Sequence, residues 1–334
     1  MKPRAPQLFV RPLLATCMGM VMFMGLGLIT AGRVEAQSSC VPPPPGLTAW
    51  FPLQNYVTDI IGGVQPMATN AISFVPGEVG QGVSLGTGGF IDLATNHVAW
   101  ENPHFTWEAW VRWDGAGPNE DFAGSCILEN CTNGVSGYAL CARASDKRFV
   151  FVCASNGSSN GSLIVAANTF TPGVFYHVAG SCDGTNFNLY VNGTLQGQLT
   201  SDVPLSWGPY WTIGCNPAFA RAAGVSRTWN GVIDEVSIYN RALTATEIQA
   251  IYHAGNAGKC LVQLAIIPAG TNALLTWPTN FNGYTLQSTT NLNVNPAALA
   301  AWTYVSTVPA IIATNNVVTN TISGPQKFFR LANP

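Results

Sequence analysis

Apolar and polar residues alternate over many short stretches of this chain, and this alternation predicts β-strands. The clearest stretch is 105–113, where Trp107 and Trp113 would share one face and Glu108 would lie on the other, because successive side chains of a strand point to opposite faces. Turn residues separate the stretches, including the Asn-Gly pair at 192–193. The other predicted strands of this block are residues 46–53, 89–93, 149–152, 174–180, 187–191, 211–214 and 231–239. Many short strands with frequent turns predict a sandwich or a barrel.

One helix interrupts this pattern. Thr244 can cap its start, and Ile248, Ile251 and Tyr252 have helical spacing up to residue 253. We therefore expect a single helix appended to a β domain that closes near Cys260.

The composition changes after Cys260. Residues 261–334 contain no cysteine, and their only charged side chains are Lys327 and Arg330. The predicted strands of this tail are residues 274–277, 284–287, 302–305, 317–318 and 328–331. This length suffices for a small fold. The fold class we predict is all-β, a β-sandwich at 46–260 followed by a second, smaller β-sandwich at 261–334.

The N-terminus has the pattern of a targeting signal. Lys2, Arg4 and Arg11 precede an apolar stretch at 13–29, and residues 34–36 fit a cleavage site. We predict a signal peptide over 1–36, followed by a Pro-rich segment at 37–45, and hence a secreted or cell-surface protein; an uncleaved membrane anchor is the alternative. The remaining chain is acidic and has no basic patch, which argues against nucleic acid as a partner.

Several segments resemble, in order and spacing, the LamG-like jelly roll of the concanavalin A-like lectin/glucanase superfamily. They are Gly46–Leu53 with Asp59, Gly77–Leu85, Phe105–Trp113, Tyr176–Gly180, Leu189–Gly193 and Gly231–Leu243. This resemblance implies that 46–260 is a laminin G type 3-like jelly roll. The tail resembles a C-terminal β module of secreted bacterial proteins through Leu275–Pro278, Gly283–Ser288, Trp302 and Phe328–Leu331.

Nine cysteines are present, and all except Cys17 lie from Cys40 to Cys260. An even number of cysteines in an exported chain indicates disulfides. Cys40 and Cys260 bracket one domain, and their bond would restrict the unfolded chain by about 4–5 kcal/mol. The other expected pairs are Cys141–Cys153 across a predicted hairpin, Cys126–Cys131 and Cys182–Cys215. Other connectivities stay open, whereas a four-cysteine metal site is disfavoured because the chain has no C-x-x-C pair.

Catalytic chemistry finds little support in the sequence. A retaining glucanase needs two carboxylates about 5–5.5 Å apart, and the chain lacks the Glu-x-Asp-x-x-Glu run that would supply them. Asp234 and Glu235 are adjacent, so strand alternation would send them to opposite faces. Glu108 stands alone on its strand. We expect structural roles for all three residues and no enzyme activity.

The resemblance also implies a calcium site. Asp59, after the first strand, and Asp234, in the last, are the candidate ligands, because Ca²⁺ binds six to eight hard oxygens. The alternative is that Asp59 is a turn residue and that Asp234 accepts hydrogen bonds from neighbouring backbone amides.

A sugar site needs an aromatic platform beside polar groups, and Trp207, Tyr210 and Trp229 lie in or beside predicted loops. We therefore expect non-catalytic binding or adhesion outside the cell, with a polysaccharide or surface glycan as the partner. The alternative is a structural subunit of an extracellular assembly that contacts other protein chains. A glycoside hydrolase is the third reading.

Overall fold

The structure is a computed structural model, and it describes most of the chain after residue 39. The described residues are 40–95, 97–115, 124–130, 137–154, 162–200, 207–217, 227–261, 263–279, 284–290, 302–321, 323 and 326–332. The predicted signal peptide lies outside them. Within these ranges, no helix is both long enough and apolar enough to cross a membrane.

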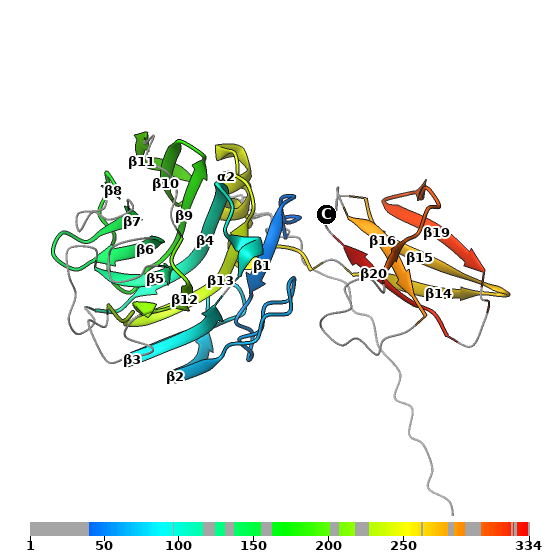
Figure 1. Ribbon diagram of the computed structural model, residues 1–334, viewed down its shortest axis with the longest axis horizontal. Helices are drawn as coiled ribbons and strands as arrows, with labels where there is room; N and C mark the ends of the chain where they lie inside the picture. The colour runs from blue at the N-terminus through cyan, green and yellow to red at the C-terminus, as the bar shows by residue number, and fades with distance from the viewer. Residues whose placement is uncertain are drawn as a thin grey trace, which may run out of the picture. The chain divides into compact units, whose positions relative to one another are not determined.

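The first domain is built from antiparallel strands joined in one hydrogen-bonded path (Figure 1). Its strands are β1 (Leu47–Phe51), β2 (Ala68–Pro76), β3 (Gln81–Thr95), β4 (His104–Trp113), β5 (Ser125–Glu129), β6 (Gly137–Arg143), β7 (Arg148–Ala154), β8 (Ser162–Val165), β9 (Phe175–Asp183), β10 (Asn186–Val191), β11 (Thr194–Thr200), β12 (Tyr210–Ile213) and β13 (Gly231–Tyr239). The path runs β11-β10-β9-β4-β13-β3-β12-β5-β6-β7-β8, with β1 paired to β13 and β2 paired to β3.

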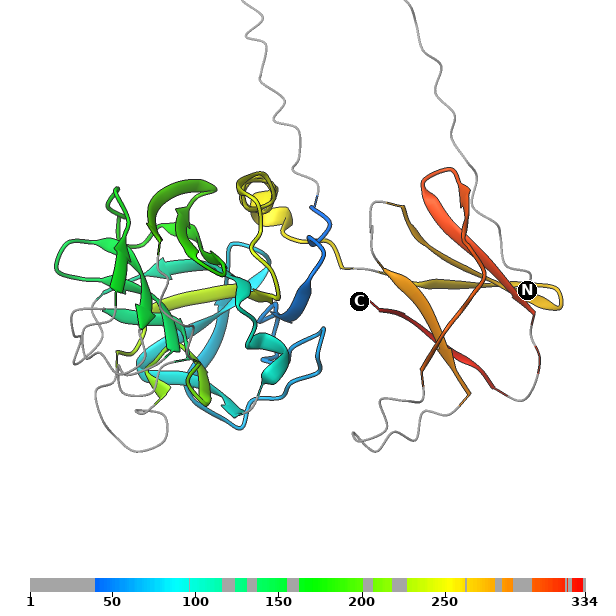
Figure 2. The ribbon, with the colours of Figure 1, turned by 45° about the horizontal axis from the view of Figure 1, so that its top comes forward.

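The path folds into two layers because β3 belongs to both. Val83–Leu85 pair with β13, whereas Ile91–Thr95 pair with β12. Between these two parts lies Gly88, at φ +78°, a backbone conformation that favours glycine. We call β11-β10-β9-β4-β13 the first layer and β12-β5-β6-β7-β8 the second layer; Figure 2 shows the two sets of strands facing each other.

The main core fills the space between the layers. Trp107 of the first layer contacts Tyr138 and Trp211 of the second, with ring centroids 6.2 Å and 5.1 Å apart. Gly180 of β9 faces the ring of Phe151 so closely that an added Cβ would lie 3.0 Å from it. This burial of the alternating apolar positions confirms the predicted jelly-roll sandwich.

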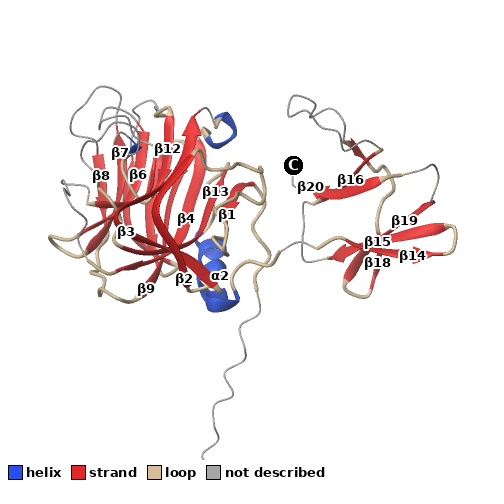
Figure 3. Ribbon diagram, turned by 90° about the horizontal axis from the view of Figure 1, so that it is seen from below, coloured by secondary structure: helices blue, strands red, loops and turns tan. Residues whose placement is uncertain are grey.

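The outer face of the first layer is covered by the helix α2 (Ala245–Ala254), which Figure 3 shows beside β1 and β13. Thr244 caps the helix and forms a capping box with Glu247. Ile248 and Ile251 pack in a second buried cluster with Leu47, Trp50, Tyr239 and Leu243. The predicted helix is therefore an outer cover of the sheet.

Cys40 and Cys260 form a disulfide, with their Cα atoms 4.9 Å apart. Beside it, Val41 and Lys259 pair as a parallel bridge. The bond joins the two ends of the first domain, as the sequence suggested.

The other expected disulfides are not formed among the described cysteines, since Cys126, Cys141, Cys153, Cys182 and Cys215 are all buried thiols. Cys131 lies outside the described residues. The strand register explains why Cys141 and Cys153 do not form a disulfide. In the ladder of β6 and β7, Cys141 stands opposite Val150 and Cys153 stands opposite Tyr138. They also point to opposite faces, Cys141 outward and Cys153 into the main core. The expectation of a Cys141–Cys153 bond was wrong.

The tail forms two small antiparallel sheets. One has the order β14 (Ala265–Ala269), β15 (Asn272–Pro278), β19 (Asn315–Thr321) and β18 (Ala310–Ile312); the other has β17 (Thr303–Tyr304), β16 (Thr285–Thr289) and β20 (Phe328–Ala332). Their shared core contains Leu275, Trp277, Leu286 and Val318. The predicted small β-sandwich is present.

Candidate functional site

Polar side chains form a row across the outer face of the second layer. Thr212 of β12 stands opposite Asp92 of β3 on one side and opposite Glu129 of β5 on the other. Thr212 points outward because its neighbours Trp211 and Ile213 enter the main core. All three polar residues of the row are buried.

Glu129 lies at one end of this row and accepts several hydrogen bonds. Arg227 Nη1 donates to its Oε1 at 3.0 Å, and Asn216 Nδ2 donates to the same oxygen at 2.8 Å. Cys126 Sγ donates to the other oxygen, Oε2. A buried carboxylate is tolerated only with such compensation, so these bonds fix the segments after β12 and before β13 against the sheet. We call Cys126, Glu129, Asn216 and Arg227 the Glu129 cluster.

Tyr210 lies beside this row. It precedes Trp211, so alternation along β12 places it on the outer face with Thr212, and it is half-buried. Asn130 binds the backbone of the segment that leads into Tyr210. Its side chain accepts from Gly208 N at 2.7 Å and donates to the carbonyl oxygen of Tyr210 at 3.2 Å. Tyr210 therefore lies on the outer face of the second layer, and its role as a sugar platform stays a prediction.

The other two expected platforms belong to the interior. Trp229 is fully buried, and its Nε1 donates to the carbonyl oxygen of Arg112 at 3.2 Å. Trp207 packs against the main core, with its ring centroid 4.7 Å from that of Tyr138 and 5.9 Å from that of Trp211. Because Trp229 is fully buried, its ring cannot contact a ligand, and the expectation that it forms a sugar platform was wrong. The sequence suggested an exposed loop at this position, whereas the side chain packs in the main core.

A second polar cluster lies beneath α2. Lys259 Nζ is 2.9 Å from Glu108 Oε1 and 3.0 Å from Glu235 Oε2, and His177 Nε2 is 2.9 Å from Glu108 Oε2. Trp50 Nε1 donates to Glu235 Oε2 at 3.1 Å. All of these side chains are buried. Burial by itself would raise the pKa of Glu108, but Lys259 and His177 together outweigh it and lower that pKa to about 2.

We call Glu108, His177, Glu235 and Lys259 the Lys259 cluster. Its two carboxylates are engaged by one ammonium group, which is the ion-pairing role expected for Glu108 and Glu235. Lys259 itself was not predicted from the sequence. The signal available was weak: a lysine directly before a cysteine expected to close the domain.

Asp234 departs from the expected alternation. A β-bulge interrupts the pairing of β13 with β4 between Asp234 and Ser237, and Glu235 has φ +57°. Ile233 and Val236 both enter the main core, three residues apart. Asp234 and Glu235 therefore both lie off the core side, and the prediction that they occupy opposite faces was wrong.

The Asp234 carboxylate anchors backbone. Its Oδ2 accepts from Val79 N at 2.9 Å, and its Oδ1 has no hydrogen-bond partner among the described residues. Burial outweighs this hydrogen bond and raises the pKa of Asp234 to about 8. The side chain is therefore mostly protonated at neutral pH.

Asp59 has a similar role. Its Oδ1 accepts from Trp50 N at 2.8 Å and from Ile61 N at 2.9 Å, and its Oδ2 accepts from Gly62 N at 2.8 Å. These donors occupy the oxygens that a cation would need. The described residues contain no group of three or more His, Cys, Asp or Glu side chains that could hold a metal. The donor set at Asp59 and Asp234 thus does not fit Ca²⁺ as it stands, and calcium binding stays a prediction.

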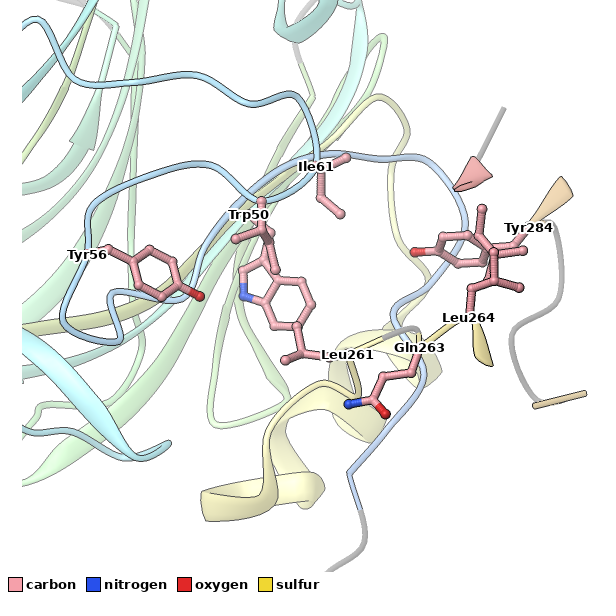
Figure 4. A pocket seen from close by; sticks show the side chains of 9 residues that line it. Trp50, Tyr56, Ile61, Leu261, Gln263, Leu264 and Tyr284 are labelled. Atoms are coloured by element: carbon pink, nitrogen blue, oxygen red, sulfur yellow. The ribbon is translucent and has the colours of Figure 1, made fainter. Parts of the chain in front are cut away.

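One pocket among the described residues has a volume of about 430 Å³, and Figure 4 shows side chains that line it. Its lining is mainly apolar and comprises Trp50, Tyr56, Ile60, Ile61, Leu261, Gln263, Leu264, Tyr284 and Leu331. It shares no residue with the row of Asp92, Thr212 and Glu129, and it includes neither Tyr210 nor any residue of the Glu129 cluster.

The fold defines a class: a two-layered, antiparallel jelly roll with a helix on one outer face. Residues 85–249 match the family model described as the concanavalin A-like lectin/glucanases superfamily, in its laminin G type 3 form. The first domain is therefore a LamG-like jelly roll of this superfamily, as the sequence motifs indicated. No curated protein matches the chain.

Solved structures share the fold at low sequence identity. The binding domain of Paraclostridial Mosquitocidal Protein 1 is 14% identical with a TM-score of 0.51, and the match covers 74% of this chain and 61% of that one. The structure described as HCR/D-Sa-GBL1/C has the same identity and TM-score, with 74% and 68% coverage. Domain 4 of AbnA, an extracellular arabinanase from Geobacillus stearothermophilus solved with arabinotriose, is 20% identical with a TM-score of 0.49, covering 61% of this chain and 97% of that one. For the first two structures, whose TM-scores exceed 0.5, the likeness at this identity concerns the fold alone.

Proposed function

We propose that this protein binds carbohydrate without catalysis, outside the cell, and that it recognises a polysaccharide or surface glycan through the outer face of the second layer. The observation that carries the proposal is the position of Tyr210 on that face, where its side chain is half-buried. The neighbouring Asp92, Thr212 and Glu129 are buried, so Tyr210 supplies the contact with the ligand. Tyrosine combines an apolar face with a polar tip, which suits sugars. The superfamily of the first domain supports this reading.

The carboxylates favour binding over hydrolysis. Glu108 and Glu235 are both engaged by Lys259. Glu129 accepts hydrogen bonds from an arginine, an asparagine and a cysteine. All three carboxylates are buried, whereas a general acid or a nucleophile has to reach the glycosidic bond of its substrate.

The test is a glycan array probed with the full chain, displaying arabinan, xylan, β-glucan and sialylated oligosaccharides. For a glycan that binds, we expect Tyr210→Ala to weaken affinity about tenfold, a loss of about 1.4 kcal/mol. Tyr56→Ala is the matched control, because Tyr56 is a partly exposed tyrosine remote from this face, and it should leave affinity unchanged. An array without a binding glycan, or equal losses in the two variants, would contradict the proposal.

Extracellular export and adhesion are part of the same proposal. Export is tested by sequencing the N-terminus of protein secreted by the host, which should begin at Gln37 after cleavage at the site read at 34–36.

One observation favours the alternative of a structural subunit. The edge strand β18 exposes Ile311 by 72% and Ile312 by 60%, and nearby Val308 is exposed by 84%. An apolar edge strand without charges is able to pair with another chain. Sedimentation at neutral pH should then show self-association that Ile311→Lys abolishes.

A further inference from the structure

Two buried thiols face each other in the second layer. Cys126 of β5 and Cys141 of β6 are directly opposite in the antiparallel ladder, and their Sγ atoms are 3.5 Å apart. Both belong to the small apolar cluster on the outer face, together with Ala139, Val150 and Val152. The two side chains therefore share one face and meet there.

The backbone geometry suits a cross-strand bond. Cys126 N donates to the carbonyl oxygen of Arg227 at 2.8 Å, so this amide does not bond across to Cys141. Directly opposite residues of an antiparallel pair have Cα atoms about 4.5–5.5 Å apart, which lies within the span of about 4.4–6.8 Å that a disulfide requires. A small rotation of the side chains would bring the sulfurs to about 2.05 Å.

We propose that Cys126 and Cys141 form a second disulfide in the exported protein. The two thiols give up two protons and two electrons to oxidised glutathione or an equivalent disulfide, which is reduced to two thiols, and one S–S bond forms. Because both side chains are fully buried in the folded domain, the bond forms while the domain folds.

The bond would change the Glu129 cluster in a defined way. Cys126 loses the S–H that donates to Glu129 Oε2, while Arg227 and Asn216 keep their bonds to Oε1. β5 and β6 become covalently joined on the outer face of the second layer. The pairing also replaces two of the bonds expected from the sequence, Cys126–Cys131 and Cys141–Cys153.

The test is a peptide map of the full chain, refolded in reduced and oxidised glutathione, alkylated at low pH and kept unreduced. Trypsin alone is insufficient, because no lysine or arginine lies between Arg112 and Arg143. Cleavage also after Glu120, Glu129 and Tyr138 separates the three cysteines of this stretch. We expect the peptide that carries Cys126 to be linked to the peptide 139–143; linkage to Cys131, or an alkylated Cys126, overturns the proposal.

Variants provide an independent readout, because thiols counted after denaturation report the bonds that the variant formed while it folded. Cys126→Ala should release Cys141 to alkylation, and Cys141→Ala should release Cys126. Cys153→Ala is the control, since Cys153 lies on the inner face of β7, and it should leave Cys126 and Cys141 protected. Release of any other cysteine by the first two variants would identify a different partner and refute the pairing.

Discussion

Charged residues are few in this chain, at 9% of the sequence, and the structure buries several of them. Lys259, Glu108, Glu235 and His177 meet beneath α2, and Glu129 meets Arg227 on the other layer. Such groups are costly to bury singly and are tolerated as paired sets. At the scale of single residues, stability therefore depends on keeping each set complete.

The Lys259 cluster makes one prediction. Glu108→Gln removes the charge that Lys259 and His177 share, so it should lower the free energy of unfolding by about 3–5 kcal/mol. Asp114→Asn is the matched control, because it breaks the surface pair of Arg112 and Asp114 next to the same strand and should cost less than about 1 kcal/mol. Urea unfolding at pH 7 measures both, and equal losses would contradict the structural role of Glu108.

The raised pKa of Asp234 predicts how the stability of the protein changes with pH. Burial raises the folded-state pKa of Asp234 from its ordinary value of 3.8 to about 8. Its contribution to stability is therefore complete below about pH 4 and is lost as pH rises through 8. Asp234→Asn keeps an acceptor for Val79 N–H without the ionisation. The melting temperature of the wild-type protein should therefore fall more steeply between pH 5 and 9 than that of the variant.

Parallel slopes for the two proteins would contradict the shifted pKa of Asp234. The same melts with EDTA and with added Ca²⁺ test the calcium prediction, because a bound cation would keep Asp234 ionised. Melting temperatures unchanged by either addition would refute a calcium site that includes Asp59 and Asp234.

At the scale of elements, the side chains of each strand alternate between the core and the outer face as the sequence predicts, except where a bulge changes their direction. The alternation in β4 placed Trp107 and Trp113 in the core and Glu108 outside it, as predicted. In β13, the bulge at Asp234 and Glu235 breaks the alternation. A bulge adds one residue to one strand of a pair, and the apolar residues around it do not reveal it.

Gly231, at the start of β13, allows a test of how closely β13 approaches β4. It has φ +144°, and a Cβ added to it would lie 2.0 Å from the carbonyl oxygen of Arg112 in β4. Gly231→Ala should therefore cost more than about 3 kcal/mol or abolish folding. Gly173→Ala is the control: its φ is +78° but the space around it is open, so its cost should be about 1–2 kcal/mol. Comparable losses for the two, measured by urea unfolding, would show that the approach of β4 is not limiting.

At the scale of the whole molecule, closure of the first domain depends on contacts between residues remote in sequence. The bond between Cys40 and Cys260 spans 220 positions, and Lys259 beside it reaches the centre of the first layer. The two layers themselves are joined through β3. The ends of the sequence block are thus part of the domain's interior.

The Cys40–Cys260 disulfide allows a test of how much the closure of the first domain contributes to its stability. Closing so long a loop restricts the unfolded chain by about 5 kcal/mol in the chain-entropy model, so Cys260→Ser should lower unfolding free energy by up to that amount. Cys40→Ser and the double variant should give the same loss, because all three remove one bond. Losses that add in the double variant would indicate that each sulfur contributes by packing.

The sequence by itself determined the fold class, the order of most strands, the capped helix and the two sandwich domains. These depend on local periodicity, turn residues and motif order, all of which are written along the chain. The closing bond of Cys40 and Cys260 was also readable, because both cysteines bracket the block.

Only the tertiary structure decided which residues meet. It placed Trp229 inside and Tyr210 outside, set Cys126 opposite Cys141, and brought Lys259 between Glu108 and Glu235. The physical reason is that strand register, bulges and the order of strands in the sheet determine these contacts, and each of them is a relation between distant segments. The alternation of apolar and polar residues within one strand does not indicate which other strands pair with it.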